Sequence, residues 1–335
     1  MFLTKRQNGN WYIFYNQKNG KRTCISCKTR IKSEALKYLS EFQRQTKEES
    51  NNDIKRITLK DFTWEYLKYS EVIHSPKTNY TVKYFVKSLL KYYPSIEVGD
   101  LNQKMVLDYI QFRLRTTTPY TAKRELAYLS AMCKWGIINN YLSFNPTSGI
   151  KRPKVPEKQP LFLSKQELST LIDTIDDDDF KDLVLFAVNT GMREGELLSL
   201  EWGQIDFKNK LILLNNRKNL TKSKKVRSIP LNEVALNIVS KRFKNRKGNI
   251  VFTYNDNPMK QLFVSHKFKK YVRKADINQD LSFHSLRHTF ASWLIHNGAS
   301  IYQVSKLLGH ADIKTTEIYA HLRNDDLQNT VNLLN

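Results

Sequence analysis

The chain has 335 residues, with 55 Lys and Arg against 32 Asp and Glu, and a net charge of +23 at pH 7. A single hydrophobic core rarely grows to this length, so we expect two or three domains. The hydrophobic content of 40% is ample for folded cores. A protein this basic usually binds a polyanion, most often nucleic acid, although a generally basic proteome would give the same charge.

Membrane and secretion signals are not expected from this sequence. No stretch approaches the roughly 18 apolar residues that span a bilayer, and the charged N-terminus lacks an apolar signal segment. Three cysteines cannot cross-link so long a chain, so we expect a cytoplasmic protein without a membrane partner. Cys24 and Cys27 form an isolated CxxC with no second pair and no nearby histidine, and we interpret them as strand residues rather than zinc ligands.

The first 50 residues have the pattern of a small β-plus-helix domain. Turn-forming clusters at 7–10 and 16–20 separate segments rich in aromatic and β-branched residues, at 11–15 and 22–28. These segments predict two or three antiparallel strands. The region is basic, with eleven Lys and Arg against four Glu.

Helical periodicity begins near residue 33 and dominates the middle of the chain. Ser33 is expected to cap a helix whose apolar face recurs through 35–42, and the polar run at 47–53 is interpreted as a linker. Residues 57–153 contain four apolar stripes at helical spacing, and Thr58 resembles the start of a capping box. Four amphipathic helices in this length predict a compact bundle, followed by a Pro-rich basic hinge.

The last part of the chain has the pattern of a mainly helical domain with a small sheet. Residues 164–167 (SKQE) form a capping box, and the segments at 211–214 and 226–231 predict a strand pair. The four aspartates at 176–179 point in different directions, so we interpret them as a solvated loop rather than a metal site.

The patterns of the three regions together predict a mainly α fold with small β elements. The expected domains are residues 1–50, 57–153 and 160–335.

The C-terminal half contains a high density of side chains that bind phosphate. Arg193 lies between two glycines, which permit a tight turn and close approach to a ligand. His284 and Arg287 are three residues apart, so at a helix start they share one face. His310 follows an expected helix end, and Tyr319 lies nine residues further on. Taken singly, each also fits a structural role, since His and Tyr are commonly half-buried and Arg is commonly solvated.

Five motifs join these residues into one pattern. They are residues 190–200 (TGMREGELLSL), 221–231 (TKSKKVRSIPL), 284–291 (HSLRHTFA), 307–310 (LLGH) and 315–321 (TTEIYAH). The pattern resembles that of tyrosine site-specific recombinases of the phage-integrase type, in the family's order and spacing. Each motif alone is weak evidence for the family, whereas five motifs in the family's order are a specific match. The preceding bundle resembles the family's core-binding domain, and the N-terminal region resembles an arm-binding domain.

The resemblance implies roles for the residues that match the motifs. Tyr319 would attack a DNA phosphate and give a 3′-phosphotyrosyl link with a free 5′-hydroxyl. Arg193 and Arg287 would bind the two non-bridging oxygens, because a guanidinium matches phosphate in a bidentate manner. His310 would donate a further hydrogen bond to the phosphate, and His284 would assist proton transfer.

Lys222 would be the general acid that protonates the 5′ oxygen, by its place ahead of the RSIPL strand. Lys224 and Lys225 remain alternatives for this role. His288 and His321 lie beside the motifs and are interpreted as structural residues.

The resemblance also implies partners and the absence of cofactors. The covalent link conserves the energy of the broken bond and arginines bind the phosphate, so neither ATP nor a metal is expected. The expected partners are double-stranded DNA at core and arm-type sites, a homo-tetramer in synapsis, and DNA-bending accessory proteins. The three-part layout favours integration and excision of a mobile element.

Three other functions remain open at this point: an Xer-like resolvase or invertase, a type IB-like topoisomerase, and a non-catalytic regulator with a helix-turn-helix at 300–319. Glu196, one turn after Arg193, either orients that arginine or a neighbouring helix, or has a purely structural role. An apolar stripe at Leu327, Val331 and Leu334 would dock on a neighbouring protomer or on its own domain.

Overall fold

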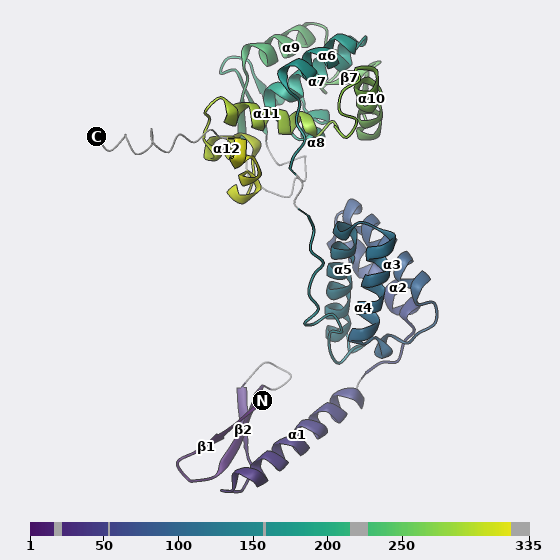
Figure 1. The fold of residues 1–335 in the computed structure, drawn as a ribbon, viewed down its shortest axis with the longest axis vertical. Coiled ribbons are helices and arrows are strands. Elements are labelled where there is room, and N and C mark those ends of the chain that lie inside the picture. The colour runs from purple at the N-terminus through teal and green to yellow at the C-terminus, as the bar shows by residue number, and fades with distance from the viewer. Residues whose placement is uncertain (17–21, 53, 157–158, 215–226, 323–335) are drawn as a thin grey trace, which may run out of the picture. The chain divides into compact units, whose positions relative to one another are not determined.

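The computed structural model describes residues 1–16, 22–52, 54–156, 159–214 and 227–322 (Figure 1). The contacts divide the chain into two compact units, Met1–Glu157 and Lys158–Asn335. Helices dominate both units, and the described strands form small antiparallel sheets. The expected fold class, mainly α with small β elements, is confirmed.

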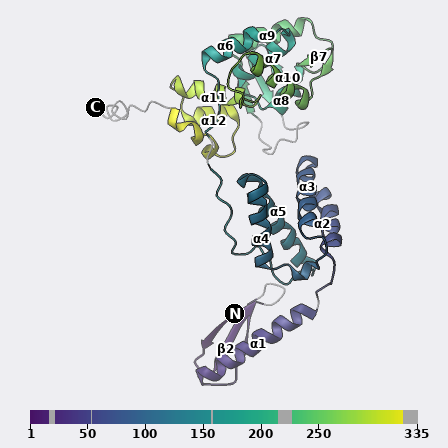
Figure 2. The same ribbon diagram turned by 45° about the vertical axis from the view of Figure 1, so that its right-hand side comes forward.

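The N-terminal sheet has the strand order β1-β2-β3, and every pairing is antiparallel. Its strands are β1 (Phe2–Lys5), β2 (Trp11–Asn16) and β3 (Arg22–Ser26). Helix α1 (Lys32–Asn52) lies along this sheet (Figure 2) and contributes Ala35 to a small core with Ile13 and Cys27. The strand prediction is confirmed, while most of the second turn cluster lies outside the described residues.

Two expectations for α1 are wrong. The helix begins at Lys32, and the carbonyl of Ile31 already accepts the bond from the Ala35 amide, so Ser33 lies inside the first turn. The helix also continues to Asn52, through most of the run that we interpreted as a linker. That run has neither glycine nor proline, and Lys and Glu are good helix formers, so polarity alone does not end the helix.

The helical bundle confirms the four apolar stripes. Its helices are α2 (Leu59–Ile73), α3 (Pro76–Tyr92), α4 (Gln103–Thr116) and α5 (Pro119–Ile138), with a short η1 (Val98–Asp100) before α4. Each α-helix begins at a side chain that accepts a backbone N–H three residues on, and the expected cap Thr58 is one of these. The buried faces share one core, which includes Phe62, Leu89, Tyr109 and Leu129.

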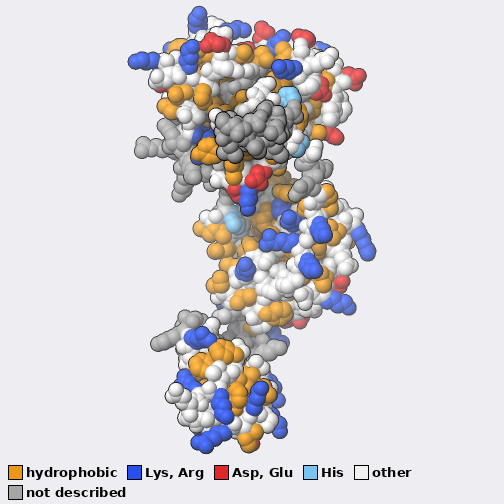
Figure 3. Space-filling view, turned by 60° about the vertical axis from the view of Figure 1, so that its left-hand side comes forward, with side chains coloured by type: hydrophobic (Ala, Val, Ile, Leu, Met, Phe, Trp, Pro, Cys, Tyr) orange, Lys and Arg blue, Asp and Glu red, His pale blue; other side chains and the backbone are white. Residues whose placement is uncertain are grey.

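The charged surface of this bundle is mainly basic. Residues 57–153 contain fourteen Lys and Arg against seven Asp and Glu. On the face shown in Figure 3, the bundle's charged side chains are mostly Lys and Arg. Within the described residues, no helix combines the length and the apolar character needed to cross a bilayer.

The second unit is built around α7. Its α-helices are α6 (Lys165–Thr174), α7 (Asp178–Thr190), α8 (Glu194–Leu198), α9 (Glu233–Lys244), α10 (Gln261–Lys274), α11 (Ser285–His296) and α12 (Ile301–Leu308). Its short 3₁₀ helices are η2 (Trp202–Gln204), η3 (Ile313–Thr315) and η4 (Glu317–Leu322). Helix α7 packs against both α9 and α11, and this arrangement places the end of α7 beside the start of α11.

The strands of this unit confirm the predicted pair, and the structure adds three more within the described residues. They are β4 (Ile205–Asp206), β5 (Leu211–Leu214) and β6 (Arg227–Pro230), with a separate pair β7 (Thr253–Tyr254) and β8 (Asn257–Pro258). Buried Ile212 and Ile229 face each other in the β5–β6 register.

The capping box at Ser164 and Glu167 is confirmed. The solvated-loop interpretation of the four aspartates is wrong in part, because Asp177 caps α7 and the next two residues begin its first turn. Aspartate is favoured there, since its carboxylate accepts free amides and lies at the positive end of the helix dipole.

Candidate active site

The candidate residues meet where three helix ends converge. Helix α7 ends at Gly191 and α12 ends at Gly309, and both glycines adopt left-handed backbone with φ of 60° and 65°. Helix α11 begins immediately after His284 and passes between them. The convergence brings polar carbonyl groups at the ends of α7 and α12 to the side chain of Arg287.

Arg287 is anchored by these carbonyls. Its Nη1 donates to the carbonyl of Gly191 and its Nη2 to that of Leu308, each at 2.7 Å, and only 4% of the residue is exposed. The negative ends of two helix dipoles therefore face the cation. Burial nevertheless lowers the pKa of Arg287 to about 9, with further lowering by Arg193 and Arg227. Positive charge is in excess here, and an anion would relieve it.

Glu196 links two further arginines. Its carboxylate accepts bonds from Arg193 Nη1 at 2.9 Å, from the Arg193 backbone amide at 2.9 Å, and from Arg227 Nη2 at 2.5 Å. Arg193 Nη2 also donates to the carbonyl of Gly309 at 3.1 Å. Of the two interpretations of Glu196, the structure matches the one in which this carboxylate orients Arg193.

The two terminal glycines have no room for a side chain. A Cβ on Gly309 would lie 2.4 Å from Arg227 Nη1, and one on Gly191 would lie 2.3 Å from the ring of Phe290. Left-handed backbone also strains any residue that has a Cβ. Glycine at both positions therefore allows the helices to end with their carbonyls toward the arginines.

His310 follows α12 directly. Its Nδ1 lies 2.8 Å from Oγ1 of Thr316, a residue with no exposed surface. Burial lowers the pKa of His310 to about 4, with further lowering by Arg287 and Arg193, so the ring is neutral at pH 7. In the tautomer with the ring proton on Nε2, Nδ1 accepts from the Thr316 hydroxyl and Nε2–H remains as a hydrogen-bond donor.

Tyr319 lies in η4 and is 2% exposed. Its hydroxyl is 2.5 Å from Nδ1 of His288 in α11. Burial raises the pKa of Tyr319 to about 12, against an opposing effect of Arg287, so the phenol is protonated at neutral pH. We expected a helix around this residue, and the structure has a 3₁₀ helix.

His284 lies at the solvent-facing start of α11. Its side chain is exposed, yet neighbouring protein atoms displace enough water to lower its pKa, with further lowering by Arg287 and Arg193. Its ring lies nearly perpendicular to that of His288, with centroids 4.9 Å apart.

The structure thus gathers Arg193, His284, Arg287, His310 and Tyr319 around the start of α11. The sixth candidate, Lys222, lies outside the described residues, as do Lys224 and Lys225.

Two residues of this site were missed by the sequence analysis. Arg227 lies in the motif at residues 221–231. Its ion pair with Glu196 joins residues 31 apart in sequence, so the motif alone does not predict it. His288 was interpreted as structural, yet it contacts the hydroxyl of Tyr319. Its spacing of four from His284 puts both rings on one helix face, and this was the available signal.

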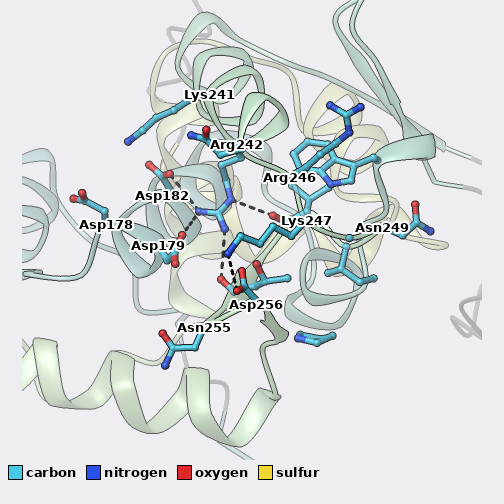
Figure 4. A pocket seen from close by; sticks show the side chains of 17 residues that line it. Asp178, Asp179, Asp182, Lys241, Arg242, Arg246, Lys247, Asn249, Asn255 and Asp256 are labelled. Carbon is cyan, nitrogen blue, oxygen red and sulfur yellow. Dashed lines mark hydrogen bonds and ion pairs between the residues drawn. The ribbon is translucent and has the colours of Figure 1, made fainter.

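A separate cavity of about 740 Å³ lies at the start of α7 and the end of α9 (Figure 4). Several of its charged groups form ion pairs: Arg242 with Asp179 and Asp182, and Lys247 with Asp256. None of the five described candidate residues lines it. This cavity therefore does not belong to the candidate site.

The conserved pattern of the Phage integrase family matches residues 161–325, which contain every candidate residue. The chain belongs to this family. It is a tyrosine recombinase, an enzyme that exchanges DNA strands.

Individual relatives fall into two groups. The ICEBs1 integrase of Bacillus subtilis is 23% identical, and the match covers 96% of each chain. The tyrosine recombinase XerD of Staphylococcus haemolyticus is 28% identical over 62% of this chain and 74% of its own.

Solved structures show the same fold. The Tn1549 transposon integrase in complex with a circular intermediate DNA matches with a TM-score of 0.71 and 19% identity, over 82% of this chain and 99% of that one. A lambda integrase dimer bound to a COC' core site matches with a TM-score of 0.69 and 19% identity, over 96% and 94%.

The contact between His310 and Thr316 gives a testable prediction. Thr316→Val keeps the side-chain volume but removes the hydroxyl that orients the imidazole, so DNA cleavage should slow by about tenfold, the equivalent of one hydrogen bond. Thr316→Ser keeps the hydroxyl and should cleave at nearly the wild-type rate. The measurement is single-turnover cleavage of a nicked core-site duplex. Equal rates for the valine and serine variants would contradict the proposed contact.

Proposed function

We propose that the enzyme integrates and excises a mobile DNA element, in the cytoplasm, by cutting and rejoining DNA through Tyr319. The observation that carries this proposal is the buried guanidinium of Arg287, which the carbonyls of Gly191 and Leu308 hold on the same helix whose His288 contacts the Tyr319 hydroxyl. A phosphate bound to this cation is a suitable target for the phenol oxygen.

The proposed reaction is an in-line displacement at phosphorus. The phenol oxygen of Tyr319 attacks, the bond to the 5′ oxygen breaks, and a 3′-phosphotyrosyl link forms. Arg193 and Arg287 bind the non-bridging oxygens, and His310 donates to one of them from Nε2. Fixed donors of this kind need no reorganisation as charge develops, and each commonly contributes about 10²–10³ in rate.

The leaving oxygen needs a proton, for which we propose Lys222. His284, exposed at the start of α11, is suited to assist proton transfer at the DNA surface. Rejoining is the same reaction reversed, with the 5′-hydroxyl of a new strand as the nucleophile.

The share of this chain that each relative matches favours a mobile-element integrase over a resolvase. The match to the ICEBs1 integrase includes the N-terminal part of the chain, whereas the match to XerD covers 62% of it. We propose that residues 1–50 are an arm-binding domain, 57–153 a core-binding domain and 160–335 the catalytic domain. The basic charge of the first two regions supports DNA binding by both.

We also propose that the protein acts as a tetramer on two DNA duplexes, with DNA-bending proteins as accessories. A lambda integrase tetramer bound to a Holliday junction is among the structures with this fold. The C-terminal stripe from Leu327 to Leu334 lies outside the described residues. Its two docking options, on a neighbour or on its own domain, both stay predictions.

The nucleophile can be tested directly. Tyr319→Phe removes only the attacking oxygen, so DNA binding should be unchanged and no covalent adduct should form on a nicked suicide substrate. Arg193→Ala and Arg287→Ala should lose most cleavage, since each leaves phosphate charge unmatched. The adduct is read on a denaturing gel. A covalent adduct that persisted in Tyr319→Phe would show that Tyr319 is not the nucleophile. If the wild-type enzyme gave relaxed plasmid as its sole product, a topoisomerase would be favoured over a recombinase.

The general acid can be tested with a modified leaving group. A 5′-bridging phosphorothiolate should restore cleavage by Lys222→Ala, because sulfur departs without protonation. The same substrate should not restore Arg193→Ala, whose defect is in phosphate binding. If the modified substrate restored cleavage by Lys224→Ala or Lys225→Ala and not by Lys222→Ala, the general acid would be the lysine whose variant is restored.

The N-terminal domain can be tested by deletion. A chain that lacks residues 1–50 should still cleave a core site but should integrate poorly, because the arm-type contacts are lost. Binding of the isolated arm sequence by the full chain should weaken steeply with salt, by about 0.9 log units in affinity per log unit of salt for each phosphate neutralised. Integration by the shortened chain at the full-length rate would show that the domain does not read an arm site.

A further inference from the structure

The phenol of Tyr319 has a protein partner that the proposed reaction has not yet used. His288 lies in the second turn of α11, and its Nδ1 is 2.5 Å from the Tyr319 hydroxyl. The two rings are tilted by 51°, with centroids 5.9 Å apart. The contact brings a nitrogen base to the atom that attacks the phosphate.

Both partners of this hydrogen bond are neutral at pH 7. Burial lowers the pKa of His288 to about 4, with further lowering by His284, Arg287 and His310, so its imidazole is neutral at pH 7. Tyr319 is protonated at that pH. In the tautomer with the ring proton on Nε2, the neutral imidazole accepts the phenol O–H at Nδ1.

We propose that His288 is a catalytic residue: its Nδ1 accepts the phenol proton as Tyr319 attacks the scissile phosphate, and returns that proton when the strands rejoin. This inference rests on the proposed function of Tyr319 as nucleophile.

The atoms balance in both directions. In cleavage the phenol oxygen forms a bond to phosphorus, its proton moves to Nδ1, and the bond from phosphorus to the 5′ oxygen breaks with its electron pair on that oxygen. The general acid then supplies a proton to the 5′ oxygen. In rejoining the 5′ oxygen forms a bond to phosphorus and its proton returns to the general acid. The bond from phosphorus to the phenol oxygen breaks, and the released phenolate takes back the proton from His288.

DNA itself strengthens this base. The positive group that faces His288 is Arg287 on the same helix, while His284 and His310 are neutral neighbours at pH 7. A phosphate bound by Arg287 adds negative charge near the imidazole, and this favours its protonated form. The histidine is therefore a weak base without DNA and a better one with the phosphate bound, so activation of the phenol depends on substrate.

His284 packs on the base rather than on the nucleophile. Its ring meets that of His288 at 88°, an edge-to-face contact that restricts rotation of the His288 imidazole. The two histidines then have separate tasks, one at the DNA surface and one at the phenol.

The test uses the full-length protein and His288→Asn. The amide oxygen of asparagine stands close to where Nδ1 stood and accepts the same hydrogen bond, but it takes up no proton at neutral pH. Cleavage of the suicide substrate should fall by about 10²–10⁴ near neutral pH. It should then rise about tenfold for each pH unit above about 7, as hydroxide replaces the base, while the wild-type rate stays level. His321→Asn, an exposed histidine in η4, should cleave like the wild type.

A second variant separates chemistry from folding. His288→Ala opens space beside the phenol, and added imidazole should restore part of its cleavage without changing DNA binding. Two results would overturn the inference. The first is cleavage by His288→Asn at the wild-type rate across the pH range. The second is a loss of cleavage rate that is equal at every pH in His288→Asn and is not relieved by imidazole in His288→Ala. Absence of an adduct with the wild-type protein, measured beside Tyr319→Phe, would instead overturn the proposed function, and the inference with it.

Discussion

The burial of Arg287 between two helix ends is the constraint on which the site depends. A buried cation is costly unless its donors are satisfied, and here the carbonyls of Gly191 and Leu308 accept from both ends of the guanidinium. These bonds tie α7 and α12 to α11, so one side chain joins three helix ends. Glycine is also required at the two helix ends, because a Cβ at Gly191 would meet the ring of Phe290 and one at Gly309 would meet the side chain of Arg227.

The excess of positive charge explains the protonation states of the remaining residues. Arg193 and Arg227 both pair with the carboxylate of Glu196, whereas Arg287 donates to carbonyl groups. This excess of positive charge, added to burial, keeps His288 and His310 neutral. A neutral imidazole can donate from one nitrogen and accept at the other, which a protonated ring cannot do. The site is therefore arranged for an anion that the protein itself does not provide. In the proposed reaction, the DNA phosphate supplies that charge and makes cleavage conditional on correct binding.

Local sequence signals predicted the elements of the fold well, and their failures have local causes. Capping residues such as Thr58 and Ser164, and the apolar stripes of the bundle, act within a few residues, so the sequence carries them directly. The linker expected at 47–53 failed because polar composition does not by itself oppose a helix. The aspartates at 176–179 were assigned to a loop because the capping role of Asp177 was not weighed against their charge.

For the candidate site, the sequence determined which residues belong together, and the tertiary structure decided what they touch. Motif order and spacing predicted Arg193, Arg287, His310 and Tyr319, because those motifs lie along the chain and can be read from it. The contact of Tyr319 with His288 joins residues 31 apart, and that of Arg287 with the carbonyl of Gly191 joins residues 96 apart. Such pairs depend on how α7, α12 and η4 pack around α11, and helical periodicity within one segment carries no information about the distance to another.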